Sequence, residues 1–268
     1  MNTRTTRAVV LARGLGRRMR ESGEVALDSA QRAAADAGLK AMIPFEGGRP
    51  FLDYVLHSLA EAGFLRAALV LGPEHEVVRD YYRHQPRRHI DVSFVTQPEA
   101  LGTADAVACA EDWTGGDPFV VLNADNLYPP HVLSRLAQGT GLAAPGFERD
   151  SLGLPLEKIG TYALLERDDR GCLAAITEKA GEERMRQAGP SALISLNIWR
   201  FDARIFDACR TVPVSERGER ELPQAVGLAA SRGACIEVFP VRGEVLDLSR
   251  RADVAEVARR LEGLRVDL

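Results

Sequence analysis

The chain has 268 residues, with 34 Lys and Arg against 38 Asp and Glu, which gives a formal net charge of −4 at pH 7. This balance excludes a basic nucleic-acid binder, which carries a marked positive excess. Hydrophobic residues make up 46% and charged residues 27%, as in soluble globular proteins. A chain of this length buries roughly three quarters of its unfolded surface, so we expect a single domain over residues 1–268 and no nucleic-acid partner.

The apolar segments and the cysteines predict the cellular location of the chain. Runs such as residues 119–122 are far shorter than the roughly 20 residues of a membrane helix, and the apolar residues 8–12 end at Arg13, too soon for a signal-peptide core. The chain has no CxxC pair, and its cysteines lie far apart, at Cys109, Cys172, Cys209 and Cys235. We expect no membrane partner, a cytoplasmic location and reduced thiols in or near the core.

Short β-branched runs alternate with helical patterns over the first half of the chain. In chain order, the pattern predicts a strand at 8–11, a helix at 51–62, a strand at 68–71, a helix at 74–82, a strand at 92–95, a helix at 102–112, a strand at 119–123 and a helix at 131–137. This alternation is typical of βαβ units and a mainly parallel sheet.

The pattern changes after about residue 145. Strand-like runs at 161–166 and 173–177 flank a turn at 168–171, which predicts a hairpin and therefore a mixed sheet. Residues 251–264 alternate apolar and charged faces and predict an amphipathic helix that packs on the domain.

Two segments interrupt this order of elements. Residues 21–38 are rich in Ala and end at Gly38, where a C-terminal cap glycine would sit, so they predict an inserted surface helix. Residues 146–159 contain scattered Gly and Pro and little periodicity. We expect them to form a loop that can move over a site.

The first predicted strand leads into a glycine-containing loop, Gly14-Leu15-Gly16-Arg17-Arg18-Met19. Its glycines let backbone N–H groups approach an anion, and its arginines donate charged hydrogen bonds, so the loop suits a phosphate. A tight turn with solvated arginines explains the same residues. Met19 stands where the dinucleotide fingerprint needs its third Gly, which argues against a nicotinamide dehydrogenase, and the P-loop Gly-Lys-Ser/Thr does not follow.

Five more segments accompany the loop in a fixed order. They read Leu39-Lys40-Ala41-Met42-Ile43-Pro44, Gly48-Arg49-Pro50-Phe51-Leu52-Asp53-Tyr54, Gln97-Pro98-Glu99-Ala100-Leu101-Gly102-Thr103-Ala104-Asp105-Ala106, Leu122-Asn123-Ala124-Asp125-Asn126 and Thr177-Glu178-Lys179. In this order, the six segments resemble the signature of the sugar-phosphate nucleotidylyltransferase (pyrophosphorylase) family. In the loop, Arg17 replaces the usual Thr.

The resemblance is looser in the last third of the chain. The segment Ser195-Leu196-Asn197-Ile198-Trp199-Arg200-Phe201 is similar to a family strand with two sugar-facing positions, and Gly243-Glu244-Val245-Leu246-Asp247-Leu248-Ser249 keeps only the aspartate of the corresponding family segment. The sugar is therefore less well defined than the chemistry.

The resemblance implies a three-layer, Rossmann-like α/β nucleotidyltransferase fold with a mixed, mainly parallel central sheet. It implies a nucleotide-binding half at about residues 1–140 and a sugar-phosphate-binding half at about 141–268. The implied reaction joins a sugar-1-phosphate to a nucleoside triphosphate with Mg²⁺ and releases pyrophosphate.

The resemblance also assigns roles to individual residues. It makes Arg18 and Lys40 the catalytic cations and Asp125 and Asp247 the Mg²⁺ ligands. It places the sugar phosphate at Asn123, Glu178, Lys179, Ser195 and Asn197. It places the nucleotide at Leu11, Ala12, Gly14, Gly16, Gln97, Gly102 and Thr103.

The residue types suit this chemistry. The attacking phosphate has a second pKa of about 6 and is anionic at neutral pH, so cations and a metal are needed rather than a general base. A glutamine amide donates and accepts at once, as the edge of uracil or thymine requires, so Gln97 predicts UTP or dTTP.

Other interpretations remain open at this stage. Asp125 can be a helix cap, Lys40 an exposed cation, Glu178 and Lys179 a solvated hairpin end, and Gln97 the end of a strand. The chain can also be a catalytically silent regulatory subunit, because Arg17 replaces Thr, or an enzyme that uses a non-sugar phosphomonoester. Association into an oligomer is compatible with the sequence.

Overall fold

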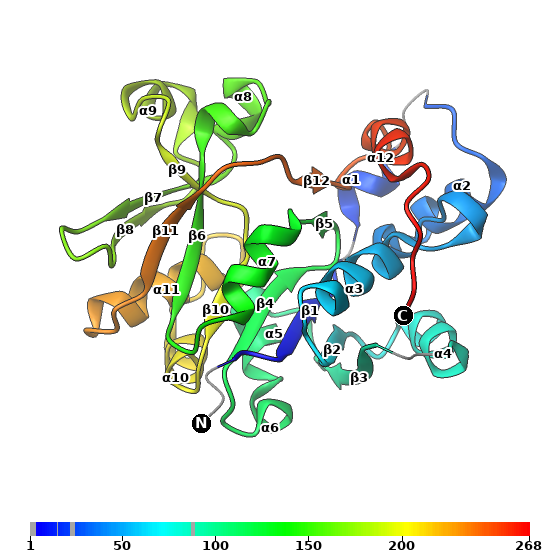
Figure 1. Cartoon of the computed structure of the whole chain (residues 1–268), viewed down its shortest axis with the longest axis horizontal. Coiled ribbons are helices and arrows are strands. Elements are labelled where there is room, and N and C mark those ends of the chain that lie inside the picture. Colours follow the sequence, from blue (N-terminus) through cyan, green and yellow to red (C-terminus); the bar gives the residue numbers. More distant parts are fainter. Residues whose placement is uncertain (1–3, 15, 22–24, 87–88) are drawn as a thin grey trace.

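The structure, a computed structural model, describes residues 4–14, 16–21, 25–86 and 89–268. Within them, ten strands form one sheet in the order β3-β2-β1-β4-β10-β6-β9-β7-β8, with β11 paired to β6, and β12 and β5 form a second, two-stranded sheet (Figure 1). The strands are β1 (Arg7–Leu11), β2 (Arg66–Leu71), β3 (Asp91–Thr96), β4 (Phe119–Asn123), β5 (Asn126–Leu127), β6 (Ala143–Glu148), β7 (Ala163–Arg167), β8 (Leu173–Thr177), β9 (Leu193–Ser195), β10 (Trp199–Phe201), β11 (Glu237–Val241) and β12 (Leu246–Asp247).

Helices connect most of these strands. They are α1 (Arg17–Arg20), α2 (Ser29–Asp36), α3 (Phe51–Glu61), α4 (Glu76–His84), α5 (Thr103–Ala108), α6 (Glu111–Thr114), α7 (Pro130–Ala137), α8 (Leu156–Ile159), α9 (Gly181–Gln187), α10 (Arg204–Thr211), α11 (Leu222–Ser231) and α12 (Asp253–Leu261). Short 3₁₀ turns occur at Lys40–Met42, Glu46–Gly48 and Arg149–Ser151.

The strand β1 lies at the centre of the parallel part of the sheet. It pairs in parallel with β2 and β4, so that Leu11 lies opposite both Val70 and Asn123, and β3 continues the parallel order beyond β2. The carboxyl ends of these strands therefore meet at one edge of the sheet, where open α/β sheets bind their ligands.

Successive residues of β1 face two separate apolar cores. Ala8 and Val10 belong to a core that includes Phe51 of α3, whereas Val9 belongs to a second core that includes Val107 of α5 and Phe206 of α10. Because side chains alternate across a strand, both faces of the sheet are covered by helices. The expected three-layer α/β fold is confirmed.

Antiparallel strands extend the sheet beyond β4. The strand β10 pairs antiparallel with both β4 and β6, and β9, β7 and β8 follow antiparallel. The strands β7 and β8 form the predicted hairpin, and the sheet is mixed, as expected. The strand β12, in the C-terminal part of the chain, pairs antiparallel with β5. Figure 1 shows α12 beside α1 and α2.

Two predicted elements differ from the structure. The helix expected at 102–112 is divided into α5 and α6, because Ala110 has the non-helical angles φ −89° and ψ 0°. The loop expected at 146–159 begins inside β6 and contains α8. Gly146 occupies the strand because a Cβ there would lie 2.8 Å from the Cβ of Leu193 on β9, so this glycine allows a close approach rather than a flexible loop.

The predicted insertion forms a shorter helix than expected. The helix α2 covers eight residues, and the Asp28 side chain accepts a hydrogen bond from the Gln31 N–H in a capping box. Gly38 follows with φ 75°, as predicted for a glycine after a helix. Residues 22–24 of the predicted helix, and Leu15 of the glycine-containing loop, lie outside the described residues.

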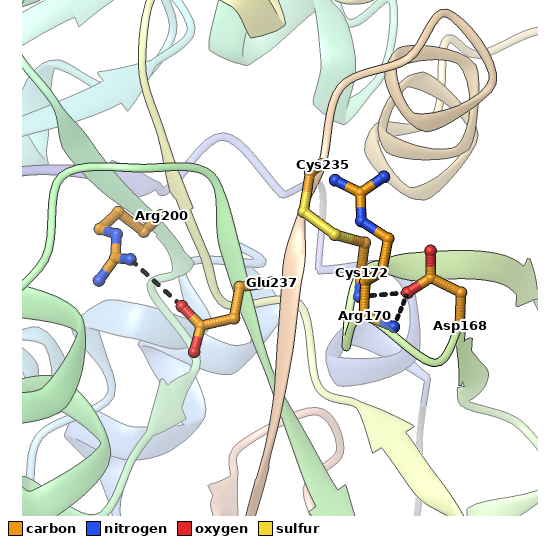
Figure 2. The surroundings of a disulfide bond; sticks show 6 residues. All are labelled: Asp168, Arg170, Cys172, Arg200, Cys235 and Glu237. Carbon is orange, nitrogen blue, oxygen red and sulfur yellow. Dashed lines mark hydrogen bonds and ion pairs between the residues drawn. A yellow bond between two sulfur atoms is a disulfide. The ribbon is translucent and has the colours of Figure 1, made fainter.

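The expectation of reduced thiols is wrong for two of the four cysteines. Cys172 and Cys235 form a disulfide with a Cα–Cα distance of 5.2 Å (Figure 2). They are 63 residues apart in sequence, and an isolated bridge between Cys172 and Glu237 brings the start of β8 beside β11. This proximity is a property of the folded sheet and leaves no mark in the cysteine spacing. Cys109 and Cys209 are free.

The described helices do not include a membrane span, since none of them is both long enough and apolar enough to cross a bilayer.

Candidate active site

The glycine-containing loop lies directly after the central strand. The Ala12 N–H donates to the Val70 carbonyl at 3.0 Å and so extends the pairing with β2. Gly16 then starts α1 with φ 57°. A Cβ on Gly16 would lie 2.3 Å from the Gly38 carbonyl oxygen, so this position needs glycine for both its conformation and its close contact.

Lys40 reaches this loop from the 3₁₀ turn Lys40–Met42. A Cβ built on Gly14 would lie 3.4 Å from Lys40 Cε, so the lysine side chain passes beside the loop. Its Nζ donates to Oδ2 of Asp125, which follows β4 and is 7% exposed. The insertion between Arg18 and Lys40 therefore leaves both of them near the carboxyl end of the parallel strands.

The second predicted metal ligand lies next to the first. In the pairing of β12 with β5, Asp247 lies opposite Asn126, and the Leu248 N–H donates to the Asp125 carbonyl at 2.9 Å. The two aspartates, far apart in sequence, are thus brought together by a strand that returns from the C-terminal region.

The Asp247 carboxyl has several partners. It accepts hydrogen bonds from the Ser249 hydroxyl and, at 3.3 Å, from the Tyr162 hydroxyl, and Lys158 Nζ lies 3.7 Å from Oδ2. Its pKa is nevertheless raised above the ordinary value, chiefly by burial, with a further increase from the negative charge of Asp125. A cation between the two carboxylates would relieve this repulsion.

The residues present suit a magnesium ion that is completed by substrate oxygens. No cluster of three or more His, Cys, Asp and Glu side chains in the described residues could hold a metal. Mg²⁺ is usually held by one or two carboxylates together with substrate phosphates and water. Asp125 and Asp247 provide such a pair at the edge of the sheet.

A cavity of about 240 Å³ lies between the loop after β1 and the start of α5. Gly102 lines it with φ 111°, and a Cβ there would lie 2.3 Å from the Arg220 carbonyl oxygen. The next residue, Thr103, accepts a hydrogen bond at its hydroxyl oxygen from the Leu222 N–H at 2.8 Å. The segment before α11 thus holds this edge of the cavity in place.

Gln97 lines the same cavity, but its amide is oriented differently from the expectation. Its Nε2 donates to the Gly102 carbonyl at 3.0 Å and to the Asp105 carboxylate at 2.8 Å. Both amide hydrogens are used within the protein, so only Oε1 remains for a ligand. The expected simultaneous donation and acceptance toward a base is therefore corrected to acceptance alone.

A larger cavity of about 560 Å³ adjoins the two aspartates. Glu178, Lys179, Ser195 and Asn197 all line it. Lys179 and Asn197 have φ values of 46° and 58°, the only positive values among the described non-glycine residues. Backbone conformations of this kind are unfavourable and concentrate at functional sites.

Glu178 is partly buried in this cavity wall. Its Oε1 is buried without a hydrogen-bond partner among the described residues. Burial, together with the nearby charge of Glu221, raises the pKa of Glu178. A guanidinium nitrogen of Arg217 lies 2.7 Å from the Glu221 carboxylate and 4.0 Å from the Glu178 carboxylate.

The predicted residues all line three adjoining cavities. Three adjoining cavities share Leu11 and Thr103, and the smallest, of about 190 Å³, lies beside Lys40. Arg18 and Asn123 line the largest cavity, and Ala12 lines the smallest. Every residue assigned from the motifs lines at least one of the three, so the structure brings together all sixteen candidates, namely Leu11, Ala12, Gly14, Gly16, Arg18, Lys40, Gln97, Gly102, Thr103, Asn123, Asp125, Glu178, Lys179, Ser195, Asn197 and Asp247.

The side chains of the largest cavity that sequence reasoning missed include Lys158, Tyr162, Arg217 and Arg250. Lys158 lies in the segment expected to be a loop, which contained no periodic signal. Arg250 follows Asp247 closely, and that short spacing is the one signal that could have identified it. Tyr162 lies next to Asp247, and Arg217 lies near Glu178, only because the folded chain brings these distant residues together.

Comparison with known proteins identifies the family of the chain. The family model described as nucleotidyl transferase matches residues 35–244. The chain belongs to this family. It is an enzyme of the nucleotidyltransferase class, and the resemblance drawn from the motifs is confirmed.

Two similar proteins are glucose-1-phosphate nucleotidyltransferases by name. The UTP–glucose-1-phosphate uridylyltransferase AglF of Haloferax volcanii is 27% identical over 258 residues, which cover 95% of this chain and 96% of that protein. The glucose-1-phosphate thymidylyltransferase of Streptomyces antibioticus is 27% identical over 256 residues, which cover 94% of this chain and 65% of that protein.

The chain is shorter than some of its relatives. It spans 60% of the low-salt glycan biosynthesis nucleotidyltransferase Agl11 of Haloferax volcanii, with 26% identity over 84% of this chain. Among solved structures, a UDP-glucose pyrophosphorylase complexed with UDP-glucose matches with a TM-score of 0.75 and 19% identity, over 97% of this chain and 100% of that one. This structural likeness supports the fold.

Proposed function

We propose that the chain transfers a nucleotidyl group from UTP or dTTP to a sugar-1-phosphate, giving a nucleoside diphosphate sugar and pyrophosphate. The observation that carries this proposal is the grouping of Lys40, Asp125 and Asp247 where the smallest and the largest of the three cavities meet. A cation and two carboxylates at the junction of a small and a large cavity suit a phosphate that joins two substrates.

In this reaction an oxygen of the sugar phosphate attacks the α-phosphorus of the triphosphate, and pyrophosphate leaves in line. The attacking phosphate is already ionised at neutral pH, since its second pKa is about 6. The chain's residues then have to hold two anions together and balance the added charge of the transition state. The reaction therefore needs cations around the site and does not need a general base.

Each cation has a distinct place in the proposal. Arg18 on α1 holds the departing phosphates, Lys40 holds the α-phosphate, and Lys179 binds the phosphate of the sugar. Lys40 is paired with Asp125 in this structure, so the α-phosphate takes the place of a carboxylate as its partner. Lys158, which is 3.7 Å from Asp247, is a further cation beside the incoming phosphate.

Asp125 and Asp247 would hold the Mg²⁺ ion, which supplies Lewis-acid stabilisation of phosphate charge when it is bound. The chain's own residues prepare the pair for this role. Ser249 and Tyr162 fix the orientation of the Asp247 carboxyl by donating hydrogen bonds to its two oxygens. Such supporting hydrogen bonds restrict the rotation of a ligand side chain.

The substrates are assigned to the cavities by size and lining. The nucleobase occupies the cavity of about 240 Å³ that Gln97 lines, and the sugar phosphate occupies the cavity of about 560 Å³ lined by Ser195 and Asn197. The choice of UTP or dTTP is supported by the names of the uridylyltransferase and thymidylyltransferase relatives.

Pyrophosphate release tests this proposal. Purified chain with Mg²⁺, UTP or dTTP and glucose-1-phosphate should release pyrophosphate, and omission of Mg²⁺ or of the sugar phosphate should abolish release. A panel of other sugar phosphates and phosphomonoesters identifies the acceptor. Binding of nucleotide without turnover of any acceptor would instead support a catalytically silent regulatory subunit.

A further inference from the structure

Arg13, immediately before the glycine-containing loop, has an unusual environment for an arginine. Its side chain is only 11% exposed and lines the cavity of about 240 Å³. Glu74 Oε1 lies 3.3 Å from Nε, and the Pro98 carbonyl oxygen lies 3.3 Å from Nη2. Two of its three nitrogens thus fix the guanidinium against the turns that follow β2 and β3.

The third nitrogen, Nη1, is buried and has no hydrogen-bond partner among the residues that the structure describes. A buried donor without an acceptor is unfavourable, more so when it carries charge. In a residue that lines a cavity, such a donor points to an acceptor on a ligand.

The second polar group of the cavity complements this donor. Because Gln97 uses both amide hydrogens on Gly102 and Asp105, its Oε1 is left to accept. Arg13 donates and Gln97 accepts. Uracil, thymine and guanine carry a ring carbonyl beside a ring N–H, which matches this pair. Adenine carries an exocyclic amine in place of that carbonyl, and the amine would face Arg13 donor to donor. Cytosine keeps its C2 carbonyl, but the ring nitrogen beside it carries no hydrogen and would face Gln97 Oε1 acceptor to acceptor.

We propose that Arg13 selects the nucleobase by donating from Nη1 to a ring carbonyl oxygen, so that the chain uses keto bases and rejects amino bases. This inference rests on the proposed function and adds a specificity-determining residue to it. Glu74 and Pro98 act on the base only through the position of Arg13.

The test is a comparison of kcat/KM for UTP, dTTP, GTP, CTP and ATP with one sugar phosphate. The wild-type chain should prefer a keto base over CTP and ATP by tenfold or more, the range expected for a charged hydrogen bond. Arg13→Ala should lower kcat/KM for the preferred keto nucleotide about tenfold or more and leave CTP and ATP nearly unchanged.

Two further variants test whether the geometry of Arg13, and not only a positive charge in the cavity, determines the preference. Arg13→Lys retains the charge without the planar fork, and should also lose most of the discrimination. Arg17→Ala removes an exposed arginine that lines the same cavity, and should leave the ratio of keto to amino nucleotides unchanged. Thermal melting of each variant confirms that it is folded.

The outcomes separate this inference from the proposed function. A wild-type preference for CTP or ATP, or an unchanged ratio in folded Arg13→Ala and Arg13→Lys, overturns the role of Arg13 while the transferase activity stands. An absence of turnover with every nucleotide contradicts the proposed function instead. A preference for keto bases in which GTP has the highest kcat/KM supports the role of Arg13 and contradicts only the choice of UTP or dTTP.

Discussion

Single charged residues beside the reacting phosphates are expected to act on the chemical step. In the proposed reaction Lys40 and Arg18 face charge that grows toward the transition state, so Lys40→Ala and Arg18→Ala should each lower kcat by about 10²-fold or more. Steady-state kinetics with saturating substrates measures this change. Arg20→Ala is the matched control, because Arg20 lies on the same short helix and its Nη2 donates to the Ala37 carbonyl. A change in KM alone would assign Lys40 and Arg18 to binding only.

The Asp247 carboxyl should make the metal-free chain less stable at neutral pH. Its folded-state pKa is raised above the ordinary 3.8 by burial and by Asp125, so the folded chain binds this proton more tightly than the unfolded chain. The stabilising contribution of the proton is therefore present at low pH and lost as the pH rises through the raised pKa.

Asp247→Asn is then expected to raise the melting temperature at pH 7 without metal. This increase in melting temperature should disappear when the pH falls below 3.8, the ordinary pKa of the carboxyl. Differential scanning calorimetry across pH measures it, with Asp169→Asn at the exposed hairpin turn as the control. A melting temperature lowered by Asp247→Asn at pH 7 would mean that the partners of this carboxylate outweigh its desolvation.

At the scale of elements, Gly102 allows the close contact between the wall of the cavity of about 240 Å³ and the segment before α11. Gly102→Ala combines an unfavourable φ of 111° with a Cβ only 2.3 Å from a backbone oxygen, and should lower the free energy of unfolding by about 1–3 kcal/mol. At Gly116, with φ 84°, an added Cβ would have no atom within 4 Å. Gly116→Ala therefore measures the cost of the backbone conformation alone and should lower the free energy of unfolding less. Urea unfolding compares them, and equal losses would exclude the contact with Arg220.

The disulfide fastens the hairpin β7–β8 to β11. A crosslink that closes a loop of this size restricts the unfolded chain, and its loss should lower the free energy of unfolding by about 2–4 kcal/mol. Melting with and without a reductant measures this loss. The double variant Cys172→Ser and Cys235→Ser should no longer respond to reductant, whereas Cys109→Ser should respond like the wild type. A wild-type chain indifferent to reductant would contradict a stabilising role.

Elements with strong local periodicity could be predicted from the sequence. The helix α3 and the strand β4 follow their predicted ranges closely, because buried apolar residues define both. The division between α5 and α6 could not be predicted, because it occurs at Ala110, a residue type that favours helix. The extension of β6 into the predicted loop depends likewise on the packing of Gly146 against Leu193.

At the scale of the whole molecule, motif order located the candidate site but not all of its contacts. The resemblance makes Asp125 and Asp247 ligands of one ion and so predicts that they lie close together. The pairing of β12 with β5 places Asp247 opposite Asn126, next to Asp125. The disulfide and the place of the cation Lys158 beside Asp247 depend on pairings between distant segments. Those pairings have no local signal in the sequence, so only the folded chain reveals them.

The proposed function assigns the nucleobase, the reacting phosphates and the sugar to adjoining cavities at one edge of the sheet. The most direct test is ³¹P NMR of the wild-type chain with Mg²⁺, UTP or dTTP, and a sugar-1-phosphate. The signals of a nucleoside diphosphate sugar and of pyrophosphate should grow in equal amounts, and neither should appear with the double variant Asp125→Asn and Asp247→Asn. Release of inorganic phosphate without a diphosphate sugar, or undiminished product formation by the double variant, would contradict the account.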